Sequence, residues 1–152
     1  MKAEQLNRLF REKGLTLGSV ESFTGGLFAN TITSISGASK FYKGGFITYA
    51  TEEKVNLLLI PQNLIDQHGV VSKEIAYYMA NNGRHLLKVD YCVSFTGNAG
   101  PEAMEGKPVG EVHIGIVSAS SGQVYSLQLE GTRKEIQEQA VEFAIERILE
   151  KL

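Results

Sequence analysis

Apolar residues recur at helical spacing in several stretches of the chain. Leu6, Leu9 and Phe10 fall on one face of an N-terminal helix that Gly14 can end. The same spacing, or a capping signal, predicts further helices at residues 27–35, after Thr51, after Ser72 and after the capping box Thr132–Glu135.

Short apolar or β-branched runs lie between these helices and predict strands. The runs are residues 15–20, 41–49 and 91–95, followed by a hairpin formed by residues 109–119 and 123–129. Strands alternate with helices early in the chain, and the hairpin comes late. This order predicts an α/β fold, a three-layer α/β/α sandwich with a mixed, mostly parallel sheet.

Composition narrows the class of protein. The 152 residues suit a single domain, with 43% hydrophobic and 21% charged residues. A net charge of -2 gives no sign of nucleic-acid binding. The lone Cys92 excludes an internal disulfide, and three histidines with one cysteine cannot form a usual Cys/His zinc cluster.

Location and assembly are predicted from the same features. No apolar run approaches the roughly 20 residues that cross a bilayer, so no membrane partner is expected. The first residues read as an amphipathic helix and not as a signal peptide, which favours the cytoplasm. An apolar hairpin edge makes a homo-oligomer the expected state.

Three segments follow predicted strands and carry small or polar residues. They are Glu21–Gly26, Thr48–Lys54 and Thr96–Pro101. In open α/β sheets, ligands bind at the carboxyl ends of strands. We therefore expect any active site to lie among these three segments.

Ser22 is the best candidate nucleophile because it lies between a buried strand and two glycines at a helix start. The backbone N–H groups of Gly25, Gly26 and Leu27 could hold an oxyanion or a phosphate. An equally good local interpretation is that Ser22 and Thr24 cap the helix. Glu21 beside them is expected to hold the turn by accepting backbone N–H groups.

A nucleophilic serine needs a base. None of the three histidines, His68, His85 and His113, has a persuasive position. Lys54 could serve if burial and a helix N-terminus lowered its pKa, and Tyr49 could relay the proton or orient the serine. Locally, a solvated helix start and a core tyrosine explain these two residues better.

The third segment is too polar and tight for a simple hairpin. Its backbone N–H groups could face a ligand, although it matches neither the P-loop nor the dinucleotide fingerprint. Its candidate binding residues are Thr96, Gly97, Asn98, Ala99 and Gly100. The run from Glu102 to Lys107 that follows is interpreted as a solvated loop.

Taken together, these segments resemble the CinA C-terminal domain family over about residues 5–150. The motifs recur in the family's order and spacing. They are Glu21–Gly26, Gly37–Ser39, Thr48–Tyr49 with Lys54, His68–Ser72, Thr96–Pro101 and Lys107–Gly110.

The resemblance implies an activity. The family includes nicotinamide-nucleotide amidases, also called NMN deamidases or PncC proteins, which convert nicotinamide mononucleotide to nicotinate mononucleotide and ammonia. Its serine nucleophile, lysine and tyrosine correspond to Ser22, Lys54 and Tyr49, and this reverses the local interpretation of the lysine. The family fold is a three-layer α/β/α sandwich. Longer relatives carry a molybdopterin-binding-like domain, so residues 1–152 resemble the stand-alone form.

The chain departs from the family pattern in several places. Phe23 stands where cysteine is common, Thr51 where asparagine is frequent, and Asn98 where isoleucine is usual. Residues 102–106 replace a glycine-rich stretch, and Thr132-Arg133 stands where Asp-Arg is common. None of these changes removes the serine, lysine or tyrosine, but they predict an altered fit to the substrate.

The hypothesis is that neutral Lys54, directly or through Tyr49, takes the proton from Ser22, which attacks the carboxamide of a pyridine mononucleotide without a metal or other cofactor. Thr24, Ser39 and Arg133 are candidate donors to the substrate phosphate. Alternatively, a charged Lys54 binds that phosphate. Two other functions remain open, a silent domain that senses pyridine nucleotides and an amidase for another small carboxamide.

Overall fold

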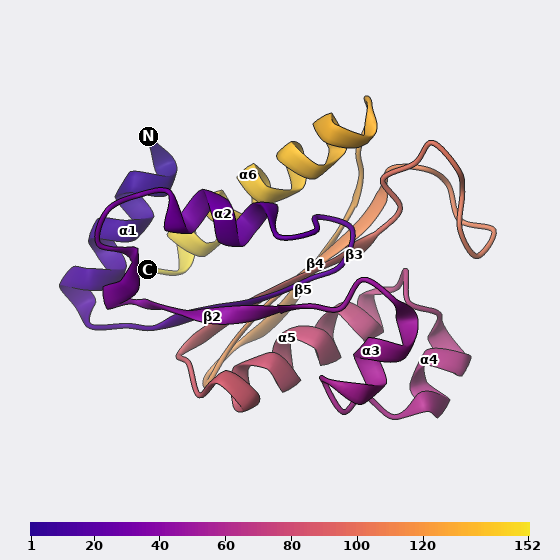
Figure 1. The fold of residues 1–152 in the computed structure, drawn as a ribbon, viewed down its shortest axis with the longest axis horizontal. Helices are drawn as coiled ribbons and strands as arrows, with labels where there is room; N and C mark the ends of the chain where they lie inside the picture. The colour runs from indigo at the N-terminus through magenta and orange to yellow at the C-terminus, as the bar shows by residue number, and fades with distance from the viewer.

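The computed structural model describes residues 1–152 as a five-stranded sheet between two layers of helices (Figure 1). The sheet order is β2-β1-β3-β4-β5. The strands are β1 (Leu17–Glu21), β2 (Tyr42–Ile47), β3 (Tyr91–Gly97), β4 (Glu111–Ser118) and β5 (Gly122–Gln128). The predicted three-layer α/β/α sandwich is confirmed.

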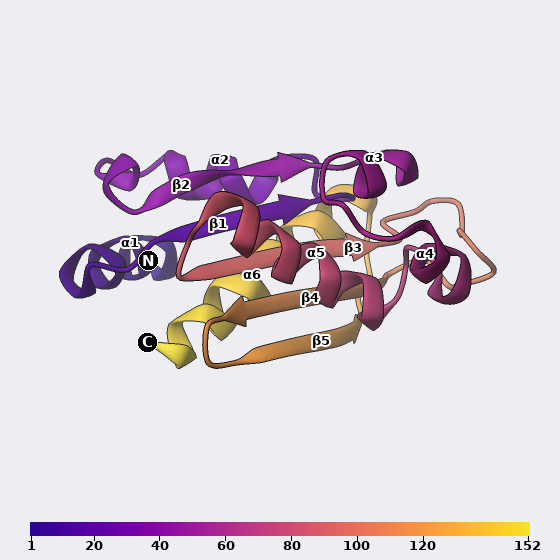
Figure 2. The ribbon, with the colours of Figure 1, turned by 90° about the horizontal axis from the view of Figure 1, so that it is seen from below.

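The sheet is mixed, as its sequence order predicts. β1 pairs in parallel with both β2 and β3, while β4 pairs antiparallel with β3 and with β5. Only β4 therefore runs against the other four strands, as its arrowhead shows (Figure 2). The carboxyl ends of β1, β2 and β3 meet at one edge of the sheet.

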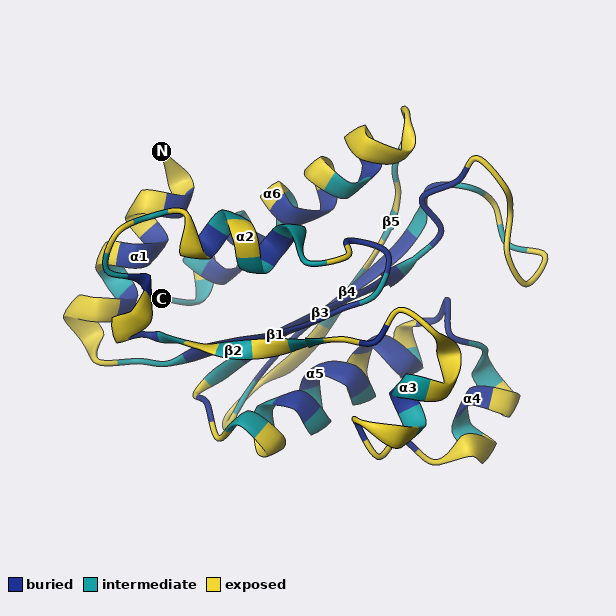
Figure 3. Cartoon of the chain, viewed as in Figure 1, coloured by how far each residue is buried: buried dark blue, intermediate teal, exposed yellow.

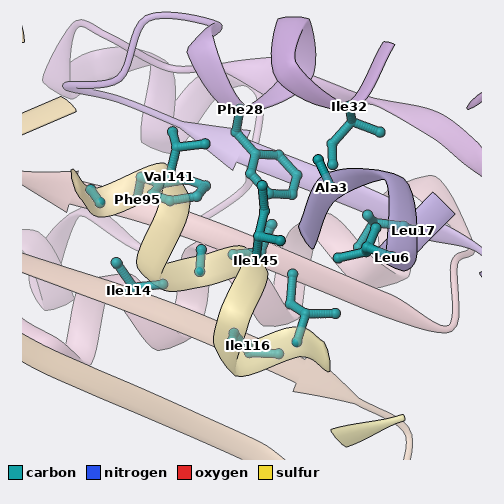
Figure 4. Close-up of a cluster of buried hydrophobic side chains, with 14 of the residues drawn as sticks. Ala3, Leu6, Leu17, Phe28, Ile32, Phe95, Ile114, Ile116, Val141 and Ile145 are labelled. Atoms are coloured by element: carbon teal, nitrogen blue, oxygen red, sulfur yellow. The ribbon is translucent and has the colours of Figure 1, made fainter. Parts of the chain in front are cut away.

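One helical layer holds the larger core. It consists of α1 (Lys2–Lys13), α2 (Leu27–Thr33) and α6 (Arg133–Lys151). Phe28 from α2 and Ile145 from α6 point toward Phe95 and Ile114 of the sheet in one buried cluster (Figure 4). Each such side chain contributes about 1.5–3 kcal/mol when fully buried. This cluster packs α2 against the sheet, and α2 begins at Leu27, shortly after the candidate nucleophile Ser22.

The opposite layer consists of α3 (Thr51–Asn56), α4 (Gln62–His68) and α5 (Lys73–Leu87). α5 lies close against the sheet because Gly83 faces it. A Cβ at Gly83 would lie 2.4 Å from Val20 and 3.0 Å from the sulfur of Cys92. The central strands are accordingly buried on both faces (Figure 3).

The local signals were mostly good predictors of element ends. Gly14 ends α1 in the left-handed conformation, Ser72 caps α5, and the capping box at Thr132 is present. Two details differ from the prediction. Thr51 is the first residue of α3 and caps nothing, because the N-cap position belongs to Ala50.

The second difference is α4, a short helix that the sequence analysis missed. Its seven residues follow Pro61 and bury Ile65 alone, so they carry no helical repeat strong enough to notice. The missed helix places the 68–71 turn beside the strand ends. No helix of the structure combines the length and the apolar character that crossing a bilayer requires.

Candidate active site

The three polar segments predicted at strand ends come together around a cavity of about 540 Å³. Because β1, β2 and β3 are parallel, the residues after each strand meet at one edge of the sheet. The cavity is lined by Ser22, Phe23, Tyr49, Thr51, Lys54, Val70, Thr96, Gly97, Asn98, Ala99, Gly100, Pro101, Glu102, Met104 and Arg133.

The turn that holds Ser22 is built around Glu21. The buried carboxylate of Glu21 accepts hydrogen bonds from the Thr24 hydroxyl at 2.6 Å and from the backbone N–H groups of Gly26, Phe28 and Ala29 at 2.9–3.2 Å. The expectation that Glu21 holds the turn is confirmed. The carboxylate also balances the positive end of α2.

The side chain of Ser22 has a different partner. It caps no helix, since α2 has no side-chain hydrogen bond at its N-cap, and its Oγ bonds only with Lys54. Its backbone N–H donates to Phe95 O at 3.0 Å and so continues the β1–β3 ladder. The interpretation of Ser22 and Thr24 as ordinary helix caps is therefore wrong.

The N–H groups first proposed for the oxyanion already have acceptors inside the protein. Gly25 donates to Ser22 O, Gly26 to the Glu21 carboxylate and Leu27 to Thr24 O. Neither glycine lines the cavity, nor does Thr24. Gly26 is still required for shape, because its φ of 106° is strained for any other residue.

Other backbone N–H groups at the cavity are free. Phe23, Ala99 and Gly100 line the cavity, and their N–H groups donate to no acceptor in the protein. The sequence analysis noted Phe23 only as a departure from the family pattern and did not propose its N–H group as a donor. The available signal was its place directly after the nucleophile, a position whose N–H stabilises the oxyanion in several hydrolases.

Lys54 is brought to Ser22 by α3. Its ammonium nitrogen lies 3.1 Å from Ser22 Oγ and 2.6 Å from Thr48 O, and the residue is only 1% exposed. Burial lowers the pKa of Lys54 from its usual value of 10.5 to about 8, although the carboxylates of Glu105 and Glu52 oppose the shift. The local interpretation of Lys54 as part of a solvated helix start is therefore wrong.

The surroundings of Lys54 leave one polar atom without a partner. Thr48 Oγ1 is buried and bonds with nothing, while the carbonyl of the same residue accepts from Lys54. Two bonds are few for a buried ammonium with three protons. The few partners agree with the lowered pKa of Lys54, because they compensate the ammonium form poorly, and a neutral amine here could accept the Ser22 proton.

Tyr49 and Arg133 meet at the mouth of the cavity. Tyr49 is 60% exposed, so it is not a core tyrosine, and its hydroxyl accepts from Arg133 Nη2 at 2.9 Å. Arg133 also donates to Gly100 O and has no carboxylate partner within 4.0 Å. No hydrogen bond joins Tyr49 to Ser22 or Lys54.

The segment after β3 combines structural bonds with cavity contacts. The Thr96 hydroxyl donates to Val70 O at 2.7 Å, and the Asn98 amide donates to Lys107 O at 3.2 Å. Gly97 pairs with Val112 at the end of β3. All five candidate residues of this segment line the cavity, but these bonds give Thr96 and Asn98 a role in shaping it.

Ser39 is the one candidate that lies far from the others. It belongs to the short helix Ala38–Lys40 before β2, at the amino end of the strand, and does not line the cavity. The prediction that no histidine serves Ser22 agrees with the structure, because none lines the cavity. His113 is held elsewhere, between Glu111 and Ser126.

Comparisons with known proteins agree on the family. A sequence model of the CinA C-terminal domain family matches residues 1–152. A protein of Bacillus mycoides, provisionally named a competence-damage inducible protein, is 44% identical over 146 residues, which are 95% of this chain. Those residues are 35% of that protein, so the chain spans about a third of the length of the curated relatives it matches.

Solved structures repeat the fold almost completely. A competence-damaged protein (CinA) superfamily protein from Klebsiella pneumoniae has a TM-score of 0.96 at 27% identity, covering 99% of this chain and 94% of that one. A competence/damage inducible protein from Agrobacterium tumefaciens has a TM-score of 0.90 at 29% identity, covering 98% and 94%.

Proposed function

The chain belongs to the CinA C-terminal domain family, and we propose that it is a serine amidohydrolase that converts nicotinamide mononucleotide to nicotinate mononucleotide and ammonia. The observation that carries the chemistry is the 3.1 Å contact between the Lys54 amine and Ser22 Oγ. The substrate follows from the family resemblance. The names of these relatives specify no substrate.

The first half of the reaction uses Lys54 as the base. With a pKa of about 8, roughly a tenth of Lys54 is neutral at pH 7. The neutral amine takes the Ser22 proton while Oγ attacks the carboxamide carbon. The free N–H groups of Phe23, Ala99 and Gly100 are the donors available to the oxyanion.

The second half of the reaction releases both products and regenerates the free enzyme. The Lys54 ammonium gives its proton to the departing nitrogen, so ammonia leaves and an acyl-enzyme ester remains. Lys54, again neutral, takes a proton from water, which attacks the ester carbon and releases the carboxylate product. Ser22 regains its proton from Lys54 as the ester bond breaks.

Arg133 is the best candidate for the substrate phosphate. It is a cation at the cavity without a carboxylate partner, whereas Lys54 is buried beside Ser22. Thr24 and Ser39 lie outside the cavity lining, so we no longer assign them this role. The proton-relay role of Tyr49, carried over from the family, requires its hydroxyl to come within hydrogen-bond distance of Ser22 or Lys54, and it bonds with neither here.

Ammonia release from nicotinamide mononucleotide tests the proposal. We expect release by the wild type and loss of at least about 10³-fold in Ser22→Ala, because the covalent route disappears. Ser120→Ala, on the exposed β4–β5 turn, is the matched control. Release that Ser22→Ala leaves unchanged would contradict the nucleophile, and binding without release would favour the sensor function.

A second candidate is an amidase for a carboxamide without phosphate. Glu102 favours this candidate, because it lines the same cavity as Arg133. Its carboxylate would repel an anionic substrate. Parallel assays with nicotinamide mononucleotide, its riboside and nicotinamide separate the two. A kcat/KM that is highest for the mononucleotide supports Arg133 as the phosphate anchor.

A further inference from the structure

The 102–107 loop contacts the rest of the protein through two charged side chains. Most of the loop is exposed, as Figure 3 shows at the edge beyond β3 and β4. The side chains of Glu105 and Lys107 nevertheless contact the protein, and they are 32% and 29% exposed. The sequence analysis treated this run as a solvated loop and did not anticipate their contacts.

Both side chains hold the backbone of the 68–71 turn. Glu105 accepts from the N–H groups of Val70 and Val71, each at 3.0 Å. Lys107 donates to Val71 O and, at 3.5 Å, to His68 O. The two side chains also form an ion pair at 3.8 Å. The carboxylate of Glu105 thus binds the N–H groups of the turn, and the ammonium of Lys107 binds its carbonyl groups.

The position of this turn decides what surrounds Lys54. Val70 lines the cavity together with Lys54, and its carbonyl accepts from Thr96 at the end of β3. Val70 and Val71 are buried in one cluster with Leu58 and Ile60, the residues that follow α3. A turn that moved away would open this wall to water.

We propose that Glu105 and Lys107 are positioning residues, which clamp the 68–71 turn against the strand ends and so keep water away from Lys54. The inference deepens the proposed function, because a dry Lys54 is what a neutral base requires. Neither residue touches the Ser22–Lys54 pair through any hydrogen bond. They act on it through the turn.

The charge of Glu105 and its clamp act on Lys54 in opposite directions. A nearby carboxylate favours the ammonium form, whereas exclusion of water favours the neutral amine. Glu52 on α3 also acts on Lys54 by charge but has no bond to the turn. Glu102 and Arg133 also line the cavity, and substitutions at Glu105 or Glu52 leave both of them unchanged. Glu52→Gln is therefore the matched control.

Amide hydrogen exchange reports on the clamp directly. In Glu105→Ala and in Lys107→Met, we expect exchange at the Val70 and Val71 amides to speed up at least about tenfold, since their acceptor is lost or loosened. In Glu52→Gln it should not change. If Glu105→Ala proves too unstable, Glu105→Gln, which keeps one acceptor oxygen, takes its place. Unchanged exchange at both amides would overturn the clamp.

A ¹³C NMR titration of the Lys54 side chain, assigned with Lys54→Arg, then tests the exclusion of water. The pKa should rise in Glu105→Ala although a carboxylate is lost, and fall in Glu52→Gln. A fall in both variants would mean that Glu105 acts by charge alone. Faster amide exchange with an unchanged Lys54 pKa would mean that the two residues only anchor the loop. Either of these two results would overturn the inference.

These two measurements need no substrate. Failure of the clamp is therefore distinct from failure of the amidase proposal, which the Ser22→Ala assay decides. Where the amidase assay succeeds, the acidic limb of kcat/KM in Glu105→Ala should move to higher pH by the same amount as the NMR titration.

Discussion

Two buried charged residues lie at the same edge of the sheet, and they differ in the number of their hydrogen bonds. Glu21 ends β1 and Lys54 follows β2, and each residue is 1% exposed. Glu21 accepts four hydrogen bonds from residues 24–29. Lys54 makes two bonds, beside a threonine hydroxyl that has no partner. Burial alone therefore does not decide how well a charge is compensated; the number of its partners does.

The difference has a free-energy consequence for Lys54. A pKa lowered from 10.5 to about 8 corresponds to roughly 3 kcal/mol of unfavourable interaction for the charged form. Between these two pH values the unfolded chain binds more protons than the folded one. Stability therefore rises with pH through this window, and the full penalty is present below about pH 8.

The largest expected effect is on turnover, in Lys54→Arg. Arginine stays charged and cannot take the Ser22 proton, so kcat/KM should fall by about 10²–10⁴-fold. In the wild type kcat/KM should rise with pH up to about pH 8, where Lys54 loses its proton. In Lys54→Arg this rise of kcat/KM with pH should be absent. If Lys54→Ala keeps kcat and only raises KM, Lys54 is instead a phosphate ligand.

The next largest effect is on stability, in Glu21→Ala. The change leaves the Thr24 hydroxyl and three helix N–H groups without their acceptor and should lower the free energy of unfolding by roughly 3–5 kcal/mol. Urea unfolding at pH 7 measures it. Glu12→Ala, on the exposed face of α1, is the control and should change little. Equal losses in both variants would mean that Glu21 is not the anchor of the turn.

A gain in stability is expected when the poorly compensated charge of Lys54 is removed. Lys54→Met removes the buried cation and should raise the free energy of unfolding at pH 7 by up to about 3 kcal/mol. The gain should shrink between pH 8 and 10.5 and vanish above it, as the wild-type lysine becomes neutral in both states. A gain that is independent of pH would show that packing, and not charge, is responsible.

The sequence predicted the fold and the central pair better than the details around them. Alternating elements specified the layers, and parallel strand ends brought Ser22 and Lys54 together. The N–H groups of Gly25 and Gly26 were misassigned because the tight turn gives each an acceptor inside the protein, Ser22 O for Gly25 and the Glu21 carboxylate for Gly26, and no sequence pattern encodes that geometry. Side-chain contacts between loops, such as Glu105 with the 68–71 turn, leave no periodic trace in the sequence.

The smallest effect sharpens the comparison most directly, because it removes a single partner of Glu21. Thr24→Val replaces a hydroxyl that donates to the carboxylate at 2.6 Å with a methyl group of similar volume. A hydrogen bond to a charged group contributes about 1.5–3 kcal/mol, and three N–H donors remain. We expect a loss of about 1–2 kcal/mol in urea unfolding.

Turnover in the same variant decides between the two roles considered for Thr24. The sequence made it a donor to the substrate phosphate, whereas the structure directs its hydroxyl at Glu21, outside the cavity lining. A KM that stays within about twofold of wild type while stability falls supports the second role. A large rise in KM with unchanged stability would break the contrast, since the turn around Glu21 would then bind substrate as well as hold Ser22 in place.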